Sequence, residues 1–175
     1  VFIDWNQFAK RDFVGDDEAI QNDIDNPNRL LKEGDRFGYD YDMTTMQTNA
    51  WAQGIFKLPY WEFFASGEVS HTRYFRTGNV RNGLYPKNSL GDSEKQDFIN
   101  YMAKAGVTYK VNGRNYLFAN GAYQTRAPFA SNAFISPRTR NTYVDQLDDE
   151  VNIFFEGGYL LRAPKLKGRA VFYYH

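Results

Sequence analysis

The sequence contains no cysteine and only two histidines, His71 and His175. Without cysteine the chain forms no disulfide, no thiolate nucleophile and no cysteine-ligated zinc site. The two histidines lie 104 residues apart, which does not match the spacing of a zinc motif. An excess of charge is also missing, because 21 basic side chains balance 21 acidic ones. The sequence therefore gives no reason to expect a metal, a cofactor or a nucleic-acid partner.

Long hydrophobic runs are absent as well. The longest unbroken run of apolar or aromatic residues covers only five positions, Ala170 to Tyr174, and the mean hydropathy is −0.64. A transmembrane helix needs about 20 such residues, so the sequence contains none. The strands of a membrane β-barrel alternate lipid-facing and lumen-facing residues and leave no such run. Hydropathy alone therefore does not separate a soluble domain from a membrane barrel.

The chain is rich in aromatic residues, and its clearest pattern is a β-hairpin over residues 98–126. Aromatic residues make up 18% of the chain. From Ile99 to Val111 every second residue is apolar or aromatic, and nearly all the residues between them are polar or small. This strict alternation predicts a strand with two unlike faces. Asn112-Gly113 is a preferred two-residue hairpin turn, because both residues tolerate a positive φ. A strand of this length exceeds the usual 5–6 residues and is long enough to cross a bilayer at a tilt, which takes roughly 9–11 residues.

Four further segments predict extended strands, and the first three of them alternate, with Trp51 and Ile55 as exceptions. They are residues 39–57, 61–76, 151–162 and 166–175. Pro59 and Pro164 mark short connections between neighbouring segments, because proline cannot donate to a strand ladder. The connections alternate between these short turns and long loops at residues 77–93 and 127–150, which are rich in Gly, Asn, Pro and charged residues.

The alternation of short and long connections is typical of an outer-membrane barrel. Soluble domains usually connect their elements through about 4–6 residues, and long structureless loops are uncommon in them. Outer-membrane barrels have short periplasmic turns and long extracellular loops at opposite ends. The 175 residues suffice for one sizeable domain. We therefore predict an all-β fold: an antiparallel transmembrane β-barrel segment of about six long strands, with short periplasmic turns and long extracellular loops.

Residues 1–38 form a separate, polar segment. Acidic residues and the Asn26-Pro27-Asn28 sequence predict a solvated extracellular loop with room for one short helix around Glu18–Asp23. A calcium-binding EF-hand loop is excluded, because the required glycine and glutamate are missing from their positions after Asp23.

No residue pattern supports an enzyme. Gly91-Asp92-Ser93 resembles the nucleophile block of one esterase superfamily, but such a serine needs a histidine base held by a carboxylate. Neither histidine follows an aspartate by three residues. The glutamates Glu62, Glu68 and Glu156 are expected to line a polar lumen. Aromatic residues near strand ends, which are Tyr60, Trp61, Tyr109, Tyr173 and Tyr174, are expected to form interfacial girdles.

Several blocks of residues resemble the barrel region of TonB-dependent outer-membrane receptors, in the group that has a carboxypeptidase-regulatory-like domain at its N-terminus. These blocks follow one another in family order between Arg36 and His175. They are Tyr39-Asp40-Tyr41-Asp42, residues 76–83 with 88–93, residues 104–109, residues 126–129 with 136–138, and Glu156-Gly157-Gly158-Tyr159. The resemblance implies that residues 39–175 are part of such a receptor barrel in the cell outer membrane.

The resemblance also implies a function in transport. Members of the family import a scarce ligand, such as a siderophore, a vitamin, a peptide or a glycan. They contain a plug domain inside a 22-stranded barrel and are driven by the inner-membrane TonB motor. This chain has no plug and no motor-contact segment, and six strands are too few to close a plugged barrel. We therefore expect it to be a segment of a larger protein, whose partners are the lipid bilayer, the remaining barrel with its plug, and the motor.

Two other functions remain open from the sequence. One is a soluble β-sandwich that binds carbohydrate through its aromatic residues, and the other is a small self-contained barrel with a structural or adhesive role. Ligand contacts are expected in the long loops, because loops carry binding residues on a rigid scaffold. The candidate ligand-binding residues are Arg81, Tyr85, Arg138 and Arg140.

The alternation also predicts which residues face lipid. Ile99, Tyr101, Ala103, Ala105, Val107 and Tyr109 should face lipid, whereas Lys104, Thr108 and Lys110 should face the lumen. A register slip of one residue would place Lys104 in hydrocarbon.

Overall fold

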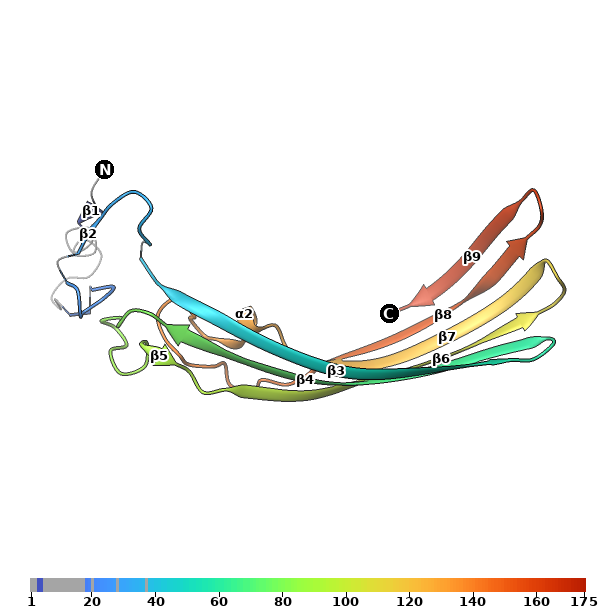
Figure 1. Ribbon diagram of the computed structural model, residues 1–175, viewed down its shortest axis with the longest axis horizontal. Coiled ribbons are helices and arrows are strands. Elements are labelled where there is room, and N and C mark those ends of the chain that lie inside the picture. Colours follow the sequence, from blue (N-terminus) through green and yellow to red (C-terminus); the bar gives the residue numbers. More distant parts are fainter. Residues whose placement is uncertain (1–2, 5–17, 20, 28, 37) are drawn as a thin grey trace. The chain divides into compact units, whose positions relative to one another are not determined.

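The computed structural model describes residues 3–4, 18–19, 21–27, 29–36 and 38–175. Its main feature is a seven-stranded antiparallel sheet in the order β3-β4-β6-β7-β8-β9, with the short β5 paired to β4. The long strands are β3 (Tyr41–Lys57), β4 (Trp61–Gly78), β6 (Gln96–Lys110), β7 (Asn115–Arg126), β8 (Glu150–Arg162) and β9 (Lys167–Tyr174). The prediction of six long antiparallel strands is confirmed (Figure 1). The sheet does not close into a barrel, because β3 and β9 are its two edges.

The remaining elements are short. β1 (Ile3–Asp4) pairs with β2 (Leu30–Leu31) in a separate two-stranded sheet, β5 covers Gly91–Asp92, and α2 covers Ala130–Ala133. Residues 18, 19 and 21–23 form turns and bends, so the described part of the Glu18–Asp23 segment is not the expected helix. Most of residues 1–17 lie outside the described residues.

The chain divides into two compact units. We call residues 1–46, 73–97 and 128–147 the loop unit, and residues 47–72, 98–127 and 148–175 the strand unit.

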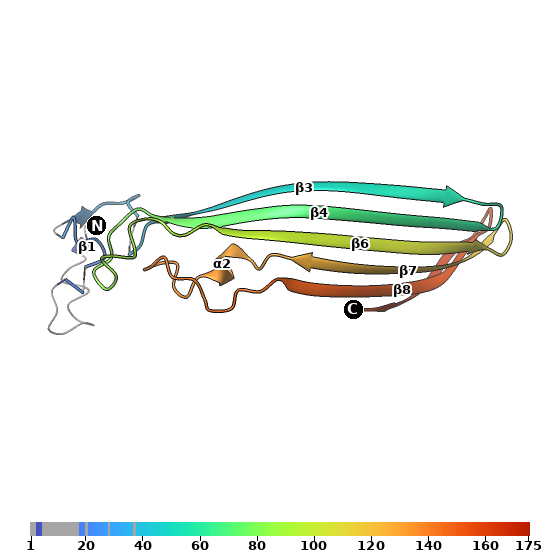
Figure 2. The same cartoon turned by 90° about the horizontal axis from the view of Figure 1, so that it is seen from below.

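In the strand unit, three short connections join the long strands at the places marked by Pro59, Gly113 and Pro164. The predicted two-residue turn at Asn112-Gly113 is wrong in detail, because residues 111–114 separate β6 from β7 and neither Asn112 nor Gly113 has a positive φ. Leu58 N donates to Trp61 O at 2.7 Å, Val111 N to Asn115 O at 3.0 Å, and Ala163 N to Leu166 O at 2.9 Å. The Asn112 side chain tightens its turn, because its Oδ1 accepts from the backbone of Arg114 at 2.9 Å and of Asn115 at 3.0 Å. Figure 2 shows these connections at one end of the sheet, where consecutive antiparallel strands reverse.

The strand unit has two unlike faces, fixed by the pairing of the strands. Val107, Ala119 and Gly157 lie opposite one another on β6, β7 and β8, and the next row on the other face is Gly106, Asn120 and Glu156. We call the first face apolar. It carries Trp61, Phe63, Ala65, Gly67 and Val69 of β4, the alternating residues Ile99–Tyr109 of β6, and Leu117, Tyr123, Ile153, Phe155 and Tyr159 of β7 and β8. The opposite face, here the polar face, carries the polar residues Glu62, Ser66, Glu68, Asn100, Lys104, Asn120, Gln124, Asn152 and Glu156. It also carries the apolar side chains of Phe64, Met102, Phe118 and Phe154.

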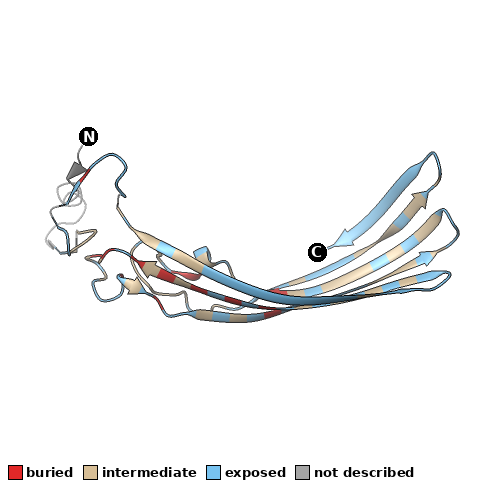
Figure 3. Cartoon of the chain, viewed as in Figure 1, coloured by how far each residue is buried: buried red, intermediate tan, exposed pale blue. Residues whose placement is uncertain are grey.

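Burial in the strand unit runs opposite to that of a water-soluble domain. Ile99, Val69 and Phe155 on the apolar face expose 70%, 57% and 58% of their surface, whereas Asn100 on the polar face exposes 2%. Along β4 the exposed residues alternate with less exposed ones, and the exposed set is the apolar one from Trp61 to Val69 (Figure 3). The prediction that the faces alternate in this register is confirmed. The two long loops at residues 79–93 and 128–147 belong to the loop unit.

Candidate functional site

The loop unit is organised around the buried side chain of Arg76, at the end of β4. Arg76 exposes 1% of its surface. Its Nη1 donates to Ser89 O at 2.9 Å and to Asn141 Oδ1, and its Nε donates to Pro137 O at 2.5 Å. The guanidinium also lies over the Tyr41 ring, 5.2 Å from its centroid. One side chain therefore joins the start of β3 to both long loops.

Arg76 is held by neutral groups rather than by a carboxylate. Its three acceptors, Ser89 O, Pro137 O and Asn141 Oδ1, are carbonyl or amide oxygens. Burial lowers the pKa of Arg76, although an arginine in a protein stays protonated. A buried charge is costly unless its donors are satisfied. The positive charge therefore depends on the two loops keeping these oxygens in place.

Further polar contacts join the same two loops. Asn141 N donates to Asn88 O at 2.7 Å, and Asn88 Nδ2 donates to Thr142 Oγ1 at 2.8 Å. The Tyr143 hydroxyl donates to Glu94 O at 2.6 Å, and burial raises the pKa of Tyr143. The Phe134 and Tyr143 rings, across an isolated β-bridge, lie 4.3 Å apart. The long loops are thus packed against each other and present a fixed surface.

Two of the four predicted binding residues, Arg138 and Arg140, lie over tyrosine rings, and a third, Tyr85, is one of those rings. The Arg140 guanidinium lies over the Tyr85 ring, 4.7 Å from its centroid, and Arg138 lies over Tyr39 at 4.9 Å. The Tyr39 and Tyr41 ring centroids are 5.9 Å apart, so Arg138, Tyr39, Tyr41 and Arg76 form a continuous stack. The structure therefore brings Tyr85 and Arg140 together. Such stacks hold a guanidinium in place while leaving its N–H groups able to bind an acceptor.

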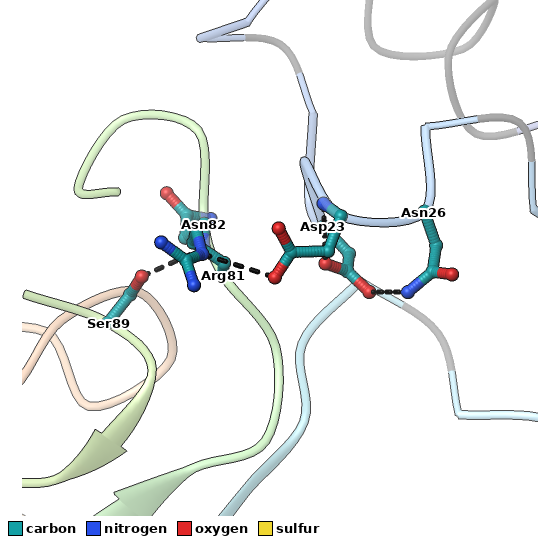
Figure 4. A network of polar contacts seen from close by, with 6 residues as sticks. Asp23, Asn26, Arg81, Asn82 and Ser89 are labelled. Carbon is teal, nitrogen blue, oxygen red and sulfur yellow. Dashed lines mark hydrogen bonds and ion pairs between the residues drawn. The ribbon is translucent and has the colours of Figure 1, made fainter. Parts of the chain in front are cut away.

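Arg81 has a different environment. Its Nε lies 3.1 Å from Asp25 Oδ2, and its carbonyl accepts from Ile24 N at 2.9 Å. Figure 4 shows this ion pair beside the bond from Asn82 N to Ser89 Oγ, which measures 2.9 Å. The ion pair and the backbone hydrogen bond anchor residues 21–27 to the loop at residues 79–93. Asp25 also neutralises the charge of Arg81. The ion pair occupies part of the Arg81 guanidinium, whose side chain is 40% exposed.

Sequence reasoning missed Arg76, Tyr39 and Asn141. The alternation of β4 placed Arg76 on the same face as Ser70 and Thr72, which was the available signal. No local pattern indicates that residues 89, 137 and 141 converge on it, because 13 to 65 residues separate them from Arg76 along the chain.

The described part of the chain offers no cluster of metal ligands. It contains no group of three or more His, Asp or Glu side chains able to hold a metal ion. Ser93 Oγ donates to Glu94 O at 2.9 Å and accepts from Arg76 N at 3.0 Å, which gives it a structural role. No described helix is long and apolar enough to cross a membrane.

The polar face of the strand unit carries a separate pocket of about 360 Å³ between β6 and β9. Lys104, Asn120, Gln124 and Glu156 line it together with Phe154 and His175, whose rings are 4.5 Å apart. Glu156 Oε1 accepts from Asn120 Nδ2 at 2.6 Å, and its Oε2 lies 3.7 Å from Arg169. Glu156 is therefore held between an amide donor and a guanidinium, and its place in a lumen stays a prediction.

Replacing Gly78 with alanine should loosen the Arg76 site. A Cβ there would lie 1.7 Å from Ser89 O and 2.6 Å from Arg76 Nη1, so the backbone of residue 89 must move. Overpacking of this kind costs about 1–3 kcal/mol. Gly67→Ala on the same strand is the control, because its nearest neighbour is Met102 O at 3.8 Å. Thermal unfolding should show a lower midpoint for Gly78→Ala alone, and equal midpoints would contradict the packing described here.

Comparison with known proteins leaves the resemblance drawn from the sequence as a hypothesis. No protein-family model, curated protein or solved structure matches this chain.

Proposed function

We propose that this chain is part of an outer-membrane β-barrel that works as a TonB-dependent receptor and imports a scarce ligand. The observation that carries the proposal is the exposed apolar face of the strand unit. In water such a face needs a second layer of structure to cover it, as in a β-sandwich. Among the described residues the strand unit belongs to one sheet only. Lipid is the solvent in which an apolar exterior and a polar interior are both stable.

The dimensions of the apolar face support this proposal. Trp61 and Tyr109 form one ring pair at 4.6 Å, and Tyr101 and Tyr123 form another at 5.9 Å. Tyr101 and Tyr109 are eight residues apart on β6, which is about 26 Å along a strand and about 20 Å along the membrane normal at a tilt near 40°. Between them lie Ala103, Ala105 and Val107. An apolar band about 25 Å tall between aromatic girdles is typical of these barrels. Tyr173 and Tyr174 join neither ring pair, because they lie opposite Glu156 and Phe155 in the middle of β8.

The edges of the sheet support a larger assembly. β3 and β9 each have one neighbouring strand among the described elements. Unpaired strand edges are not tolerated in hydrocarbon, so further strands must pair with them. We infer that these strands and the plug belong to the rest of the receptor.

Membrane fractionation tests the barrel. The full protein that carries this chain should remain in membranes washed with carbonate, dissolve only in detergent, and migrate differently on gels before and after heating. A soluble protein of unchanged mobility would instead favour the sandwich, whose apolar face would be covered by a second layer.

Substitutions in the loop unit test import. Arg138→Ala and Arg140→Ala should each lower uptake of the cognate cargo about tenfold, because each removes a charge-assisted contact worth roughly 1.5–3 kcal/mol. Tyr85→Ala should act like Arg140→Ala, since the ring orients that guanidinium. Arg81→Ala should have a smaller effect, because Asp25 already neutralises it.

Uptake of labelled siderophore, cobalamin, peptide and oligosaccharide is the measurement, with Lys87→Ala as the control. Unchanged uptake of every compound by the variants at residues 85, 138 and 140 would show that this surface does not bind cargo.

A further inference from the structure

The short connections of the strand unit carry charge of one sign. The whole chain is electrically balanced, yet residues 57–61, 110–116 and 160–168 contain no acidic residue. Six cations lie in or beside the three connections: Lys57, Lys110, Arg114, Arg162, Lys165 and Lys167. We call these six residues the basic rim. The nearest acidic side chain along the chain is Glu62, on the polar face.

Backbone hydrogen bonds bring the three connections together at one end of the sheet (Figures 1 and 2). Lys110 N donates to Tyr60 O and Arg162 N to Arg114 O, both at 2.7 Å. Five of the six rim side chains are exposed, and Lys110 is half-buried. No rim side chain forms an ion pair with any residue that the structure describes. The charges therefore add up instead of being neutralised locally.

Aromatic rings lie directly beside the rim. Tyr60 and Trp61 are exposed and follow Lys57 by three and four residues, and Tyr109 precedes Lys110. The Arg162 guanidinium lies over the Tyr116 ring, 5.2 Å from its centroid. Tyrosine and tryptophan favour the level of lipid headgroups. Long basic side chains placed just beyond such rings extend toward the headgroup phosphates.

We propose that the basic rim binds anionic phospholipid headgroups in the leaflet that the short turns face. This inference rests on the proposed membrane location of the strand unit. The rim is continuous with the exposed apolar face through Tyr109 and Trp61, so its partner must offer negative charge and hydrocarbon side by side. A bilayer surface offers both, whereas a soluble anion offers only charge. Each basic residue near an anionic bilayer contributes about 1 kcal/mol.

Lipid titration of the detergent-solubilised full protein, followed by native mass spectrometry, measures this preference. Phosphatidylglycerol should bind more tightly than phosphatidylcholine, and high salt should reduce the difference. The rim variant is the triple substitution Arg114→Gln, Lys165→Gln and Lys167→Gln, whose side chains make no described contact. Its preference for phosphatidylglycerol over phosphatidylcholine should be about 100-fold lower than that of wild type, because each of the three charges contributes about 1 kcal/mol. Its matched control is Arg29→Gln, Lys32→Gln and Lys87→Gln, three exposed cations of the loop unit, which should keep the preference.

The outcomes separate this inference from the proposed function. If the wild-type protein and the rim variant both insert into vesicles and show the same headgroup preference, the rim proposal is overturned and the barrel proposal stands. A protein that inserts into no vesicle overturns the barrel itself. Inorganic phosphate that competes as well as the lipid would show that the rim binds any anion, which also overturns the proposal. Loss of the preference in the rim variant alone supports it.

Discussion

Replacing Ala105 with arginine should impair assembly of the protein far more than replacing Lys104 with arginine. The two residues are neighbours on β6 but lie on opposite faces, since Ala105 pairs with Gly121 and Lys104 with Ala122. Ala105 lies near the middle of the apolar band between Tyr101 and Tyr109. An arginine at the bilayer midplane costs about 2–4 kcal/mol on the lipid face of a barrel. Lys104→Arg only exchanges one cation for another beside the Phe64 ring, 5.8 Å away.

This pair of variants distinguishes lipid from water as the surroundings of the apolar face. Ala105 is exposed and faces a hollow lined by Ala65, Ala103 and Gly121, so a longer side chain meets no obstacle there. In water an arginine at this site would be harmless or would improve solubility. The fraction of heat-modifiable, folded protein in isolated membranes is the measurement. Equal folding of the two variants, or poorer folding of Lys104→Arg, would mean that the faces are reversed or that no membrane is involved.

Replacing Arg76 with methionine should release the two long loops from each other. Methionine fills part of the space but leaves Ser89 O, Pro137 O and Asn141 Oδ1 without their donor. Each buried acceptor left without a partner costs about 1–3 kcal/mol. If the free energy of opening the loops falls by about 3 kcal/mol, amide exchange in residues 79–93 and 128–147 should become roughly 100-fold faster. Cargo uptake should fall as well, because Arg138 and Arg140 lie in the released loop.

Two further variants show whether the effect comes from the fork of donors on Arg76. Arg76→Lys keeps the charge but offers no planar fork of donors. Its rate of amide exchange in the long loops should therefore lie between those of wild type and Arg76→Met. Arg73→Met removes another arginine of β4, whose bonds to Asp97 measure 2.8 and 3.0 Å at an exposed site. Exposed ion pairs contribute about 0–1 kcal/mol, so amide exchange in the loops should change little. Equal loop exchange in Arg76→Met and Arg73→Met would mean that Arg76 does not hold the loops.

The sequence by itself determined the strands, their faces and their short turns. Period-two alternation from Ile99 to Val111 requires two unlike faces, and Asn112-Gly113 marks where the chain reverses, because both effects depend on neighbouring residues only. The length of that turn, four residues instead of two, did not follow from the sequence. Pro59 and Pro164 marked the other turns for the same local reason. The basic rim was also readable as charge, although only the pairing of the strands shows that its three connections lie together.

Only the tertiary structure decided how the long loops are arranged. Arg76 binds residues 89, 137 and 141, and no local propensity links positions so far apart in the chain. The same holds for the pairing of Arg140 with Tyr85 and of Arg81 with Asp25, which give two of the predicted binding residues unlike roles. Loops lack a repeating pattern of burial, so their contacts depend on which side chains meet after the strands have set the distance between loop ends. That dependence is why the scaffold followed from the sequence and the candidate site did not.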